Sequence, residues 1–259
     1  MTKVMSATLF ALIATFASAQ SDTRLPTFAT KGQEWEYRNY MPYLGMFIRR
    51  DDREVTTFVY KVVVVKDSAG SSYCHIIKTG TAAKNPEHEW HRDFVVRVDS
   101  QSLTLPVDYY LNDTVFQCDF SGGAAMRGVG IATQLSGDSL WYPSSLDSTA
   151  SLPLTEFFIQ QRVHDPAAAM YKADHPAGMP GNYKIKSKGA IISRNIVGVQ
   201  KIRTQAGEFV CLHIHLHVQY EKPRIANDID EFYCPTVGLV RSQDKAGNLM
   251  ELTRVRKKR

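Results

Sequence analysis

The sequence lacks most of the short motifs by which enzymes are recognised. It has no nucleotide-binding glycine loop, no GxGxxG fingerprint and no GxSxG nucleophile elbow. It holds only four cysteines, and no long apolar run follows the one at its N-terminus. These absences argue against nucleotide-dependent enzymes, common serine hydrolases and further membrane-spanning helices. The sequence therefore favours a non-catalytic protein over an enzyme.

The first nineteen residues have the three parts of a secretory signal peptide. Lys3 is their only charged residue, an apolar run covers 4–16, and the small-residue site Ala17-Ser18-Ala19 follows. A buried N-terminal helix is the alternative interpretation. We expect residues 1–19 to be removed near Ala19, which places the mature chain in the periplasm or outside the cell. After this processing it would not be transmembrane.

The positive charge of the chain is concentrated at its C-terminus. The formal net charge is +5, and five of the last six residues are lysine or arginine. We therefore expect one domain over 20–255 followed by a basic tail at 256–259. Such a tail either contacts anionic lipid or polysaccharide or is simply solvated. Export makes nucleic acid a poor partner.

Alternating and β-branched runs predominate, whereas helical periodicity is scarce. The clearest predicted strands are 33–40, 56–66, 72–79, 93–98, 185–203, 208–219 and 230–242. Short turn signals separate many of them, as in an antiparallel meander. The middle of the chain is less regular, with 141–143 and 152–154 expected to be extended connections. The pattern predicts an all-β fold, either an open or closed barrel or a sandwich, preceded by a cleaved signal helix.

Three residues mark predicted structural turns in the C-terminal third. Gly207 follows Ala206 between two strand patterns, where a tight hairpin favours a residue with positive φ. Gly238, three residues after Pro235, indicates a bulge that bends the last hairpin.

An even number of cysteines in an exported chain predicts disulfides. Four cysteines allow three pairings. We favour Cys211–Cys234, which are the closest in sequence and on neighbouring predicted strands, and this leaves Cys74–Cys118.

The most unusual pattern is a histidine at every second residue of one predicted strand. His213, His215 and His217 share a face, opposite the apolar residues between them. Imidazoles at i and i+2 can share a zinc ion, and Asp228, Asp230 and Glu231 are candidates for a further ligand. A solvated histidine-rich face is the alternative interpretation. Without metal, such a cluster would still gain charge as the pH falls.

Several segments resemble a known group of exported bacterial proteins. The pattern Ala206-Gly207-x-Phe209-x-Cys211 and the block 231–242 resemble those of the TapB-like group, part of a larger family of unknown function. Segments 31–37, 140–146 and 152–154 are similar to its other conserved blocks. The resemblance implies a secreted β-rich fold and no catalytic residues to carry over, and the histidine triplet is not part of it.

We expect an exported β-rich envelope protein, a non-catalytic module that binds an apolar or glycan ligand or an envelope partner. No cofactor is expected under this hypothesis. The alternative is a metal-binding protein or metal-dependent hydrolase that uses zinc on the face of His213, His215 and His217. A third hypothesis is a structural protein held to surface polymers by its basic tail.

Overall fold

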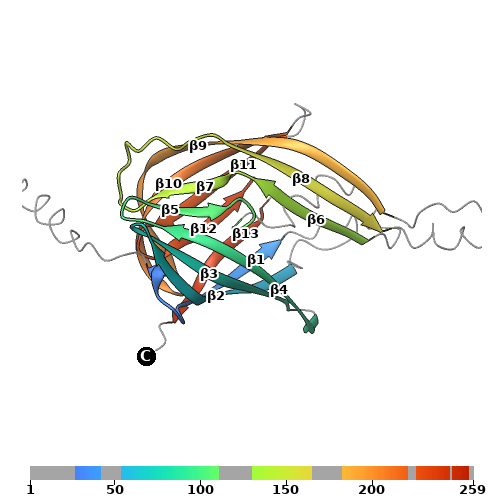
Figure 1. Ribbon diagram of the computed structural model, residues 1–259, viewed down its shortest axis with the longest axis horizontal. Coiled ribbons are helices and arrows are strands. Elements are labelled where there is room, and N and C mark those ends of the chain that lie inside the picture. The colour runs from blue at the N-terminus through green and yellow to red at the C-terminus, as the bar shows by residue number, and fades with distance from the viewer. Residues whose placement is uncertain are drawn as a thin grey trace, which may run out of the picture.

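The computed structural model describes residues 27–41, 54–83, 85–110, 130–164, 183–220, 226–245 and 247–256 (Figure 1). The predicted signal peptide, Cys118 and residues 257–259 lie outside these ranges. The described elements are η1 (Thr27–Ala29), β1 (Glu34–Met41), β2 (Glu54–Ser68), β3 (Ser71–Ala82), β4 (Asn85–Val98), β5 (Ser102–Pro106), β6 (Gly130–Gly137), β7 (Ser139–Pro143), β8 (Thr155–His164), β9 (Tyr183–Thr204), β10 (Gly207–Tyr220), β11 (Ala226–Cys234), β12 (Gly238–Asp244) and β13 (Leu249–Arg256). Within these ranges, no helix has the length and apolar character that a membrane crossing requires.

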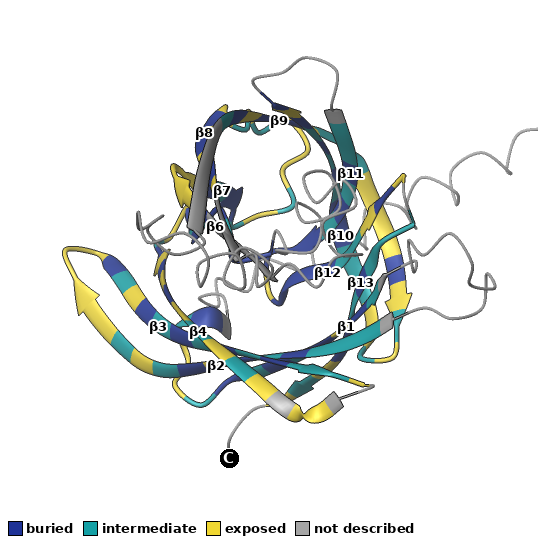
Figure 2. Cartoon of the chain, turned by 90° about the vertical axis from the view of Figure 1, so that its right-hand side faces the viewer, coloured by how far each residue is buried: buried dark blue, intermediate teal, exposed yellow. Residues whose placement is uncertain are grey.

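All the strands belong to one antiparallel sheet that curls into a nearly closed barrel (Figure 2). Its order is β6-β8-β9-β10-β11-β12-β13-β1-β2-β3-β4-β5-β7. Consecutive strands are neighbours from β8 to β13 and again from β1 to β5, and β1 pairs with β13 to join the two meanders. The two edges of the sheet are β6 and β7. The predicted all-β barrel is confirmed.

Side-chain alternation gives the sheet an apolar inner face. On β10, Leu212, Ile214 and Leu216 are fully buried, while the residues between them are partly exposed. The same alternation runs along β3. Because successive side chains point to opposite faces of a strand, the inward rows of neighbouring strands combine into one continuous core.

Irregularities in the pairing help the sheet to curl. The register shifts opposite Val63 on β2, Val197 on β9 and Val240 on β12, where one strand carries an extra residue. Bulges of this kind bend a strand and increase its twist, and curvature of that sort is needed to close a sheet on itself.

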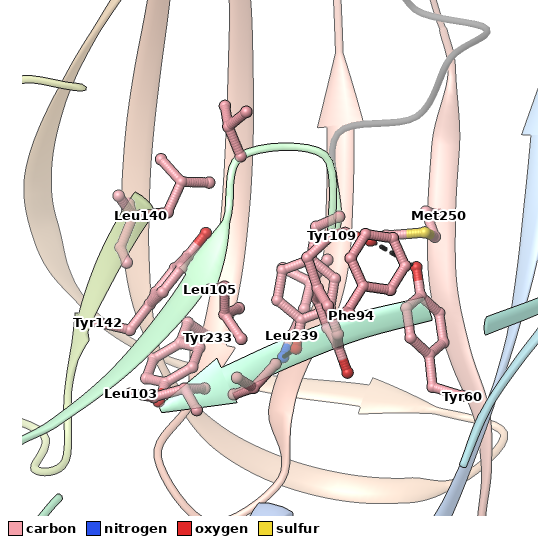
Figure 3. Close-up of a cluster of buried hydrophobic side chains, with 14 of the residues drawn as sticks. Tyr60, Phe94, Leu103, Leu105, Tyr109, Leu140, Tyr142, Tyr233, Leu239 and Met250 are labelled. Atoms are coloured by element: carbon pink, nitrogen blue, oxygen red, sulfur yellow. Dashed lines mark hydrogen bonds between the residues drawn. The ribbon is translucent and has the colours of Figure 1, made fainter. Parts of the chain in front are cut away.

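A cluster of buried aromatic and aliphatic side chains from both meanders and β7 lies inside the barrel (Figure 3). The Tyr60 hydroxyl donates to the carbonyl of Tyr109 over 2.8 Å, and their rings lie 4.9 Å apart. The backbone of Leu239 is held from two sides. Its carbonyl accepts from the Tyr37 hydroxyl over 2.9 Å, and its N–H donates to the Tyr110 hydroxyl over 3.1 Å. These bonds satisfy buried hydroxyls that burial alone would penalise.

The predicted strands match the observed ones in the outer thirds of the chain and diverge in the middle. The run predicted over 230–242 is two strands, β11 and β12, joined by a tight turn in which the N–H of Val237 donates to the carbonyl of Cys234. Segment 141–143, expected to be a connection, forms part of β7. Gly207 has φ of 136° in the predicted hairpin.

Gly238 does not form the predicted bulge. It opens β12 directly after the turn that contains Pro235, with φ of 95°. A Cβ atom there would lie 2.4 Å from the Phe28 ring and 2.6 Å from the Tyr110 hydroxyl. The position therefore requires glycine for its backbone angle and also for the closeness of the aromatic core.

We expect Gly238→Ala to destabilise the fold much more than Gly70→Ala. Both glycines have positive φ, but an added Cβ at Gly70 meets nothing within 4 Å. Gly70→Ala should cost about 1–2 kcal/mol for the left-handed backbone alone. Gly238→Ala should add an overpacking cost of about 1–3 kcal/mol. Urea unfolding of both variants measures the difference, and equal losses would contradict the packing described here.

Candidate functional site

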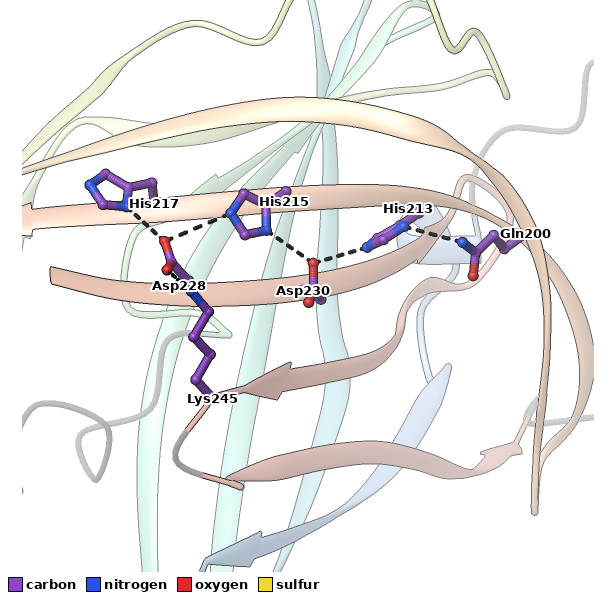
Figure 4. Close-up of polar contacts among 7 residues, drawn as sticks. All are labelled: Gln200, His213, His215, His217, Asp228, Asp230 and Lys245. Atoms are coloured by element: carbon purple, nitrogen blue, oxygen red, sulfur yellow. Dashed lines mark hydrogen bonds and ion pairs between the residues drawn. The ribbon is translucent and has the colours of Figure 1, made fainter.

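The histidine-rich face of β10 lies on the outside of the barrel beside β11. Registry places His215 opposite Asp230 and His217 opposite Asp228 (Figure 4). Since Asp228 and Asp230 are two residues apart on β11, both carboxylates point to the same side as the imidazoles. The sequence prediction that His213, His215 and His217 share a face is confirmed.

The carboxylates and imidazoles alternate along the two strands. Asp230 Oδ1 lies 3.0 Å from both His213 Nε2 and His215 Nδ1. Asp228 Oδ1 lies 2.7 Å from His217 Nδ1 and 3.7 Å from His215 Nε2.

This histidine–aspartate ladder is fixed at both ends. Gln200 lies 3.3 Å from His213 Nδ1, and the His213 ring stacks on Phe232 with centroids 4.8 Å apart. At the other end Lys245 forms an ion pair with Asp228. Hydrogen bonds from His217 and Lys245 lower the pKa of Asp228 to about 2.

The ladder does not have the arrangement of a metal site. Within the described ranges, no group of three or more histidine, cysteine, aspartate or glutamate side chains could hold a metal ion. The ring nitrogens that face β11 point at carboxylate oxygens instead of converging on a common point. Glu231, the third proposed ligand, lies on the opposite face of β11 and is fully buried.

Metal binding by His213, His215 and His217 stays a prediction that elemental analysis can test. We expect no stoichiometric zinc after dialysis, because one nitrogen of each ring contacts Asp228 or Asp230 and the described residues offer no convergent set of ligands. The paired variant Asp228→Asn, Asp230→Asn provides the comparison, since it weakens those contacts and leaves the histidines in place. Stoichiometric zinc in the unaltered protein that is lost on replacing the histidines would contradict this expectation.

A second polar cluster lies inside the barrel. Glu231 on β11 and Arg194 on β9 are buried, and Tyr142 on β7 lies between them. The Tyr142 hydroxyl donates to Glu231 Oε2 over 2.9 Å, and the Arg194 guanidinium lies 5.0 Å from the centre of the Tyr142 ring. Burial raises the pKa of Glu231 to about 7, although the positive charge of Arg194 and the Tyr142 hydrogen bond oppose the shift.

The sequence analysis did not predict this interior cluster, although the alternation of inward and outward residues along β9 indicates that Arg194 points inward. Ile192 and Arg194 are two residues apart on β9, so the arginine shares the inward face of a buried isoleucine. The same rule applied to β11 separates outward Asp230 from inward Glu231.

The titration of Glu231 should make stability depend on pH. A buried acid with a raised pKa holds its proton more tightly in the folded state, so its stabilisation is present at low pH. This contribution is lost as the pH rises from 4.5 to about 7. Relative to Glu231→Gln, the wild type should lose about 3 kcal/mol over that range, at 1.36 kcal/mol per pKa unit.

Urea unfolding of wild type and Glu231→Gln across this pH range measures the effect. Glu208→Gln is the matched control, because its carboxylate is half exposed and pairs with Lys201 on the surface. A difference between wild type and Glu231→Gln that stays constant with pH would contradict the assignment.

The predicted disulfides are not formed among the described cysteines. Cys74, Cys211 and Cys234 are buried free thiols. Cys211 and Cys234 do lie on neighbouring strands, but they share a hydrogen bond instead of a covalent bond. That bond raises the pKa of Cys211 and lowers the pKa of Cys234 to about 6. The predicted partner of Cys74, Cys118, lies outside the described residues.

Comparison with known proteins places the fold and the family. The fold is similar to the crystal structure of a putative lipoprotein from Parabacteroides distasonis, with a TM-score of 0.57 and 15% identity over 90% of this chain and 97% of that one. It is also similar to a putative exported protein with a YmcC-like fold from Bacteroides fragilis, with a TM-score of 0.56 and 14% identity over 90% and 98% of the two chains. At this identity the likeness concerns the fold alone.

Sequence comparison identifies the family of the chain. No curated protein matches the chain. Residues 30–254 match the DUF3108-like family, and this stretch includes every described strand apart from the last residues of β13. The chain therefore belongs to the DUF3108-like family.

Proposed function

We propose that this protein is an exported, non-catalytic β-barrel module that binds an apolar small molecule at the rim of its barrel. The observation that carries the proposal is a cleft of about 430 Å3 across β8, β9 and β10. Ligand pockets for small molecules typically have volumes of about 300–1,000 Å3.

The lining of the cleft suits an apolar ligand. At the end of β10, the cleft is lined by side chains that point into the barrel and by side chains that point to its outer surface. The lining residues are Glu156, Phe157, Phe158, Gly189, Ala190, Ile191, Gln219 and Tyr220. Phe158 and Ile191 remain 54% and 43% exposed, which is unusual for large apolar side chains on adjacent strands. Exposed apolar surface grouped at a cleft is typical of a binding site.

The chemistry of the lining favours binding over catalysis. Glu156 and Tyr220 are the only ionisable residues among the described lining, which contains no serine, cysteine, lysine or histidine to serve as a nucleophile or its base. The remaining residues supply apolar surface and one amide, Gln219. Such a lining can hold and orient a molecule, but it offers no pair of groups for proton transfer.

The names of the structural neighbours support a location outside the cytoplasm. One neighbour is named as a lipoprotein and the other as an exported protein. Together with the apolar run over 4–16 and Ala17-Ser18-Ala19, they support export and removal of residues 1–19 near Ala19. We also propose that the chain belongs to the narrower TapB-like group of exported proteins.

The binding proposal is tested with the apolar fluorescent dye N-phenyl-1-naphthylamine. We expect saturable binding to the unaltered protein and about tenfold or greater weakening in Phe158→Asp, because the dye would then bury against an unpaired carboxylate. Val95→Asp on β4 is the matched control, since Val95 is also exposed but lies far along the sheet from the cleft.

The other hypotheses give different results in this experiment. Absence of dye binding, or equal binding by Phe158→Asp and the unaltered protein, would overturn the apolar site. Displacement of bound dye by soluble polysaccharide, with no displacement by apolar competitors, would favour the glycan ligand instead.

A further inference from the structure

Arg194 is a buried cation without a hydrogen-bond partner. Its side chain is only 6% exposed. Within the described part of the chain, its three guanidinium nitrogens are buried and no acceptor lies within hydrogen-bond distance. An arginine carries five N–H donors, and burying a charge without acceptors is among the costliest arrangements in a protein interior. The fold therefore holds a guanidinium that an oxyanion would satisfy.

Glu231 does not fill this role. Its carboxylate accepts a hydrogen bond from Tyr142, and no ion pair joins it to Arg194 within the described residues. The two groups still interact electrostatically, because the positive charge of Arg194 opposes the rise in the pKa of Glu231. The Arg194 guanidinium lies over the Tyr142 ring, whose hydroxyl bonds Glu231. The arginine thus has a nearby countercharge and keeps its donors unused.

Beside Arg194, β9 is paired with a neighbouring strand on one side only. β8 pairs with β9 only as far as Thr155 opposite Ile192, and Arg194 lies two residues beyond that point. From there on, β10 is the only described strand paired with β9. β7, which carries Tyr142, is an edge strand and pairs with β5 alone. The seam between β7 and β9 is therefore the stretch of the described wall beside the buried guanidinium that no strand pairing closes.

Apolar residues border this seam on the outside. Leu154, just before β8, is 68% exposed, and Val197, on the part of β9 that lacks pairing with β8, is 57% exposed. Val197 is also the extra residue of the β9 bulge. Bulges are common next to binding sites, where they redirect side chains.

An inward row of buried residues on β9 runs from the cleft to Arg194. Ala190 lines the cleft, Ile192 follows on the same face, and Arg194 comes next. At about 3.3 Å per residue, the guanidinium end of this row lies roughly 13 Å from the cleft. Thr155, beside Ile192 on this path, has a buried hydroxyl without a partner in the described chain, which adds a further polar contact for a ligand.

We propose that Arg194 binds the anionic head group of an amphiphile, a carboxylate or phosphate, whose apolar chain lies along β9 toward the cleft. This inference rests on the proposed function and names its ligand class. Arginine suits the task because its planar fork can give two parallel hydrogen bonds to one carboxylate or phosphate. The ligand's head supplies the missing acceptors, and its tail contacts the apolar row.

Displacement of N-phenyl-1-naphthylamine by matched lipids tests the inference. Palmitate and hexadecanol share a chain length and differ in charge, and lysophosphatidate with monopalmitin gives the corresponding phosphate comparison. We expect the unaltered protein to prefer an anionic lipid over its neutral partner by about 10- to 100-fold, the worth of charge-assisted hydrogen bonds in a buried site. The pair that shows the larger preference identifies the head group.

Arg194→Gln should remove this preference while hexadecanol still binds within about twofold of its original affinity. Arg97→Gln on β4 is the charge-matched control, since Arg97 is about half exposed and its loss changes the net charge equally. Circular dichroism confirms that each variant is folded. Should Arg194→Gln not fold, Arg194→Lys takes its place, and it should weaken the preference because lysine keeps the charge and lacks the planar fork.

The outcomes separate this inference from the proposed function. Binding of dye and neutral lipid without preference for the anionic one would overturn the role of Arg194 and leave the apolar site intact. A preference that survives Arg194→Gln would also overturn it. If neither dye nor any lipid binds, the proposed function itself fails.

Discussion

The pairing of β1 with β13 is the contact on which the rest of the structure depends. It joins the β1–β5 meander to the β8–β13 meander and turns two open sheets into one curled wall. Side-chain hydrogen bonds from β1 and β13 support this part of the sheet. The Tyr37 hydroxyl reaches the carbonyl of Leu239, and the Thr253 hydroxyl donates to the carbonyl of Glu36 over 3.0 Å. These residues are more than 200 positions apart in sequence, so the chain must close a very long loop before the interior exists.

Once the wall has closed, alternation alone divides polar residues between two very different environments. Asp230 and Glu231 are adjacent on β11, yet the first bonds histidines on the outer face and the second is fully buried. The outer carboxylates keep low pKa values because donors and solvent surround them, while burial raises the pKa of Glu231. A one-residue shift in the β10–β11 register would exchange these environments, and the cost of burying two aspartates makes such a shift unfavourable.

The sequence allowed prediction of the parts of this fold that depend on local alternation. The face of His213, His215 and His217 followed from period-two patterning, and Gly207 followed from hairpin geometry. The positions of Cys211 and Cys234 on neighbouring strands were also predictable. The sequence does not determine whether two adjacent thiols form a disulfide or a hydrogen bond, and here they form a hydrogen bond. The interior cluster escaped prediction because it combines side chains from β7, β9 and β11, whose proximity depends on how the whole sheet curls.

The open seam and the buried arginine are consequences of one crossing of the chain. Gly137 ends β6 against the backbone of β8, where a Cβ atom would lie 2.6 Å from the Glu156 carbonyl oxygen. The chain then passes through Asp138, whose N–H donates to that carbonyl, and continues as β7. It thus passes from one edge strand of the sheet to the other without pairing them, and β7 places Tyr142 over Arg194. A sheet closed by full pairing would have placed the guanidinium behind a continuous wall, whereas this crossing leaves β9 beside it paired with β10 alone. The position of the seam therefore decides that the buried guanidinium lies beside the one-sided part of β9 and not behind paired strands.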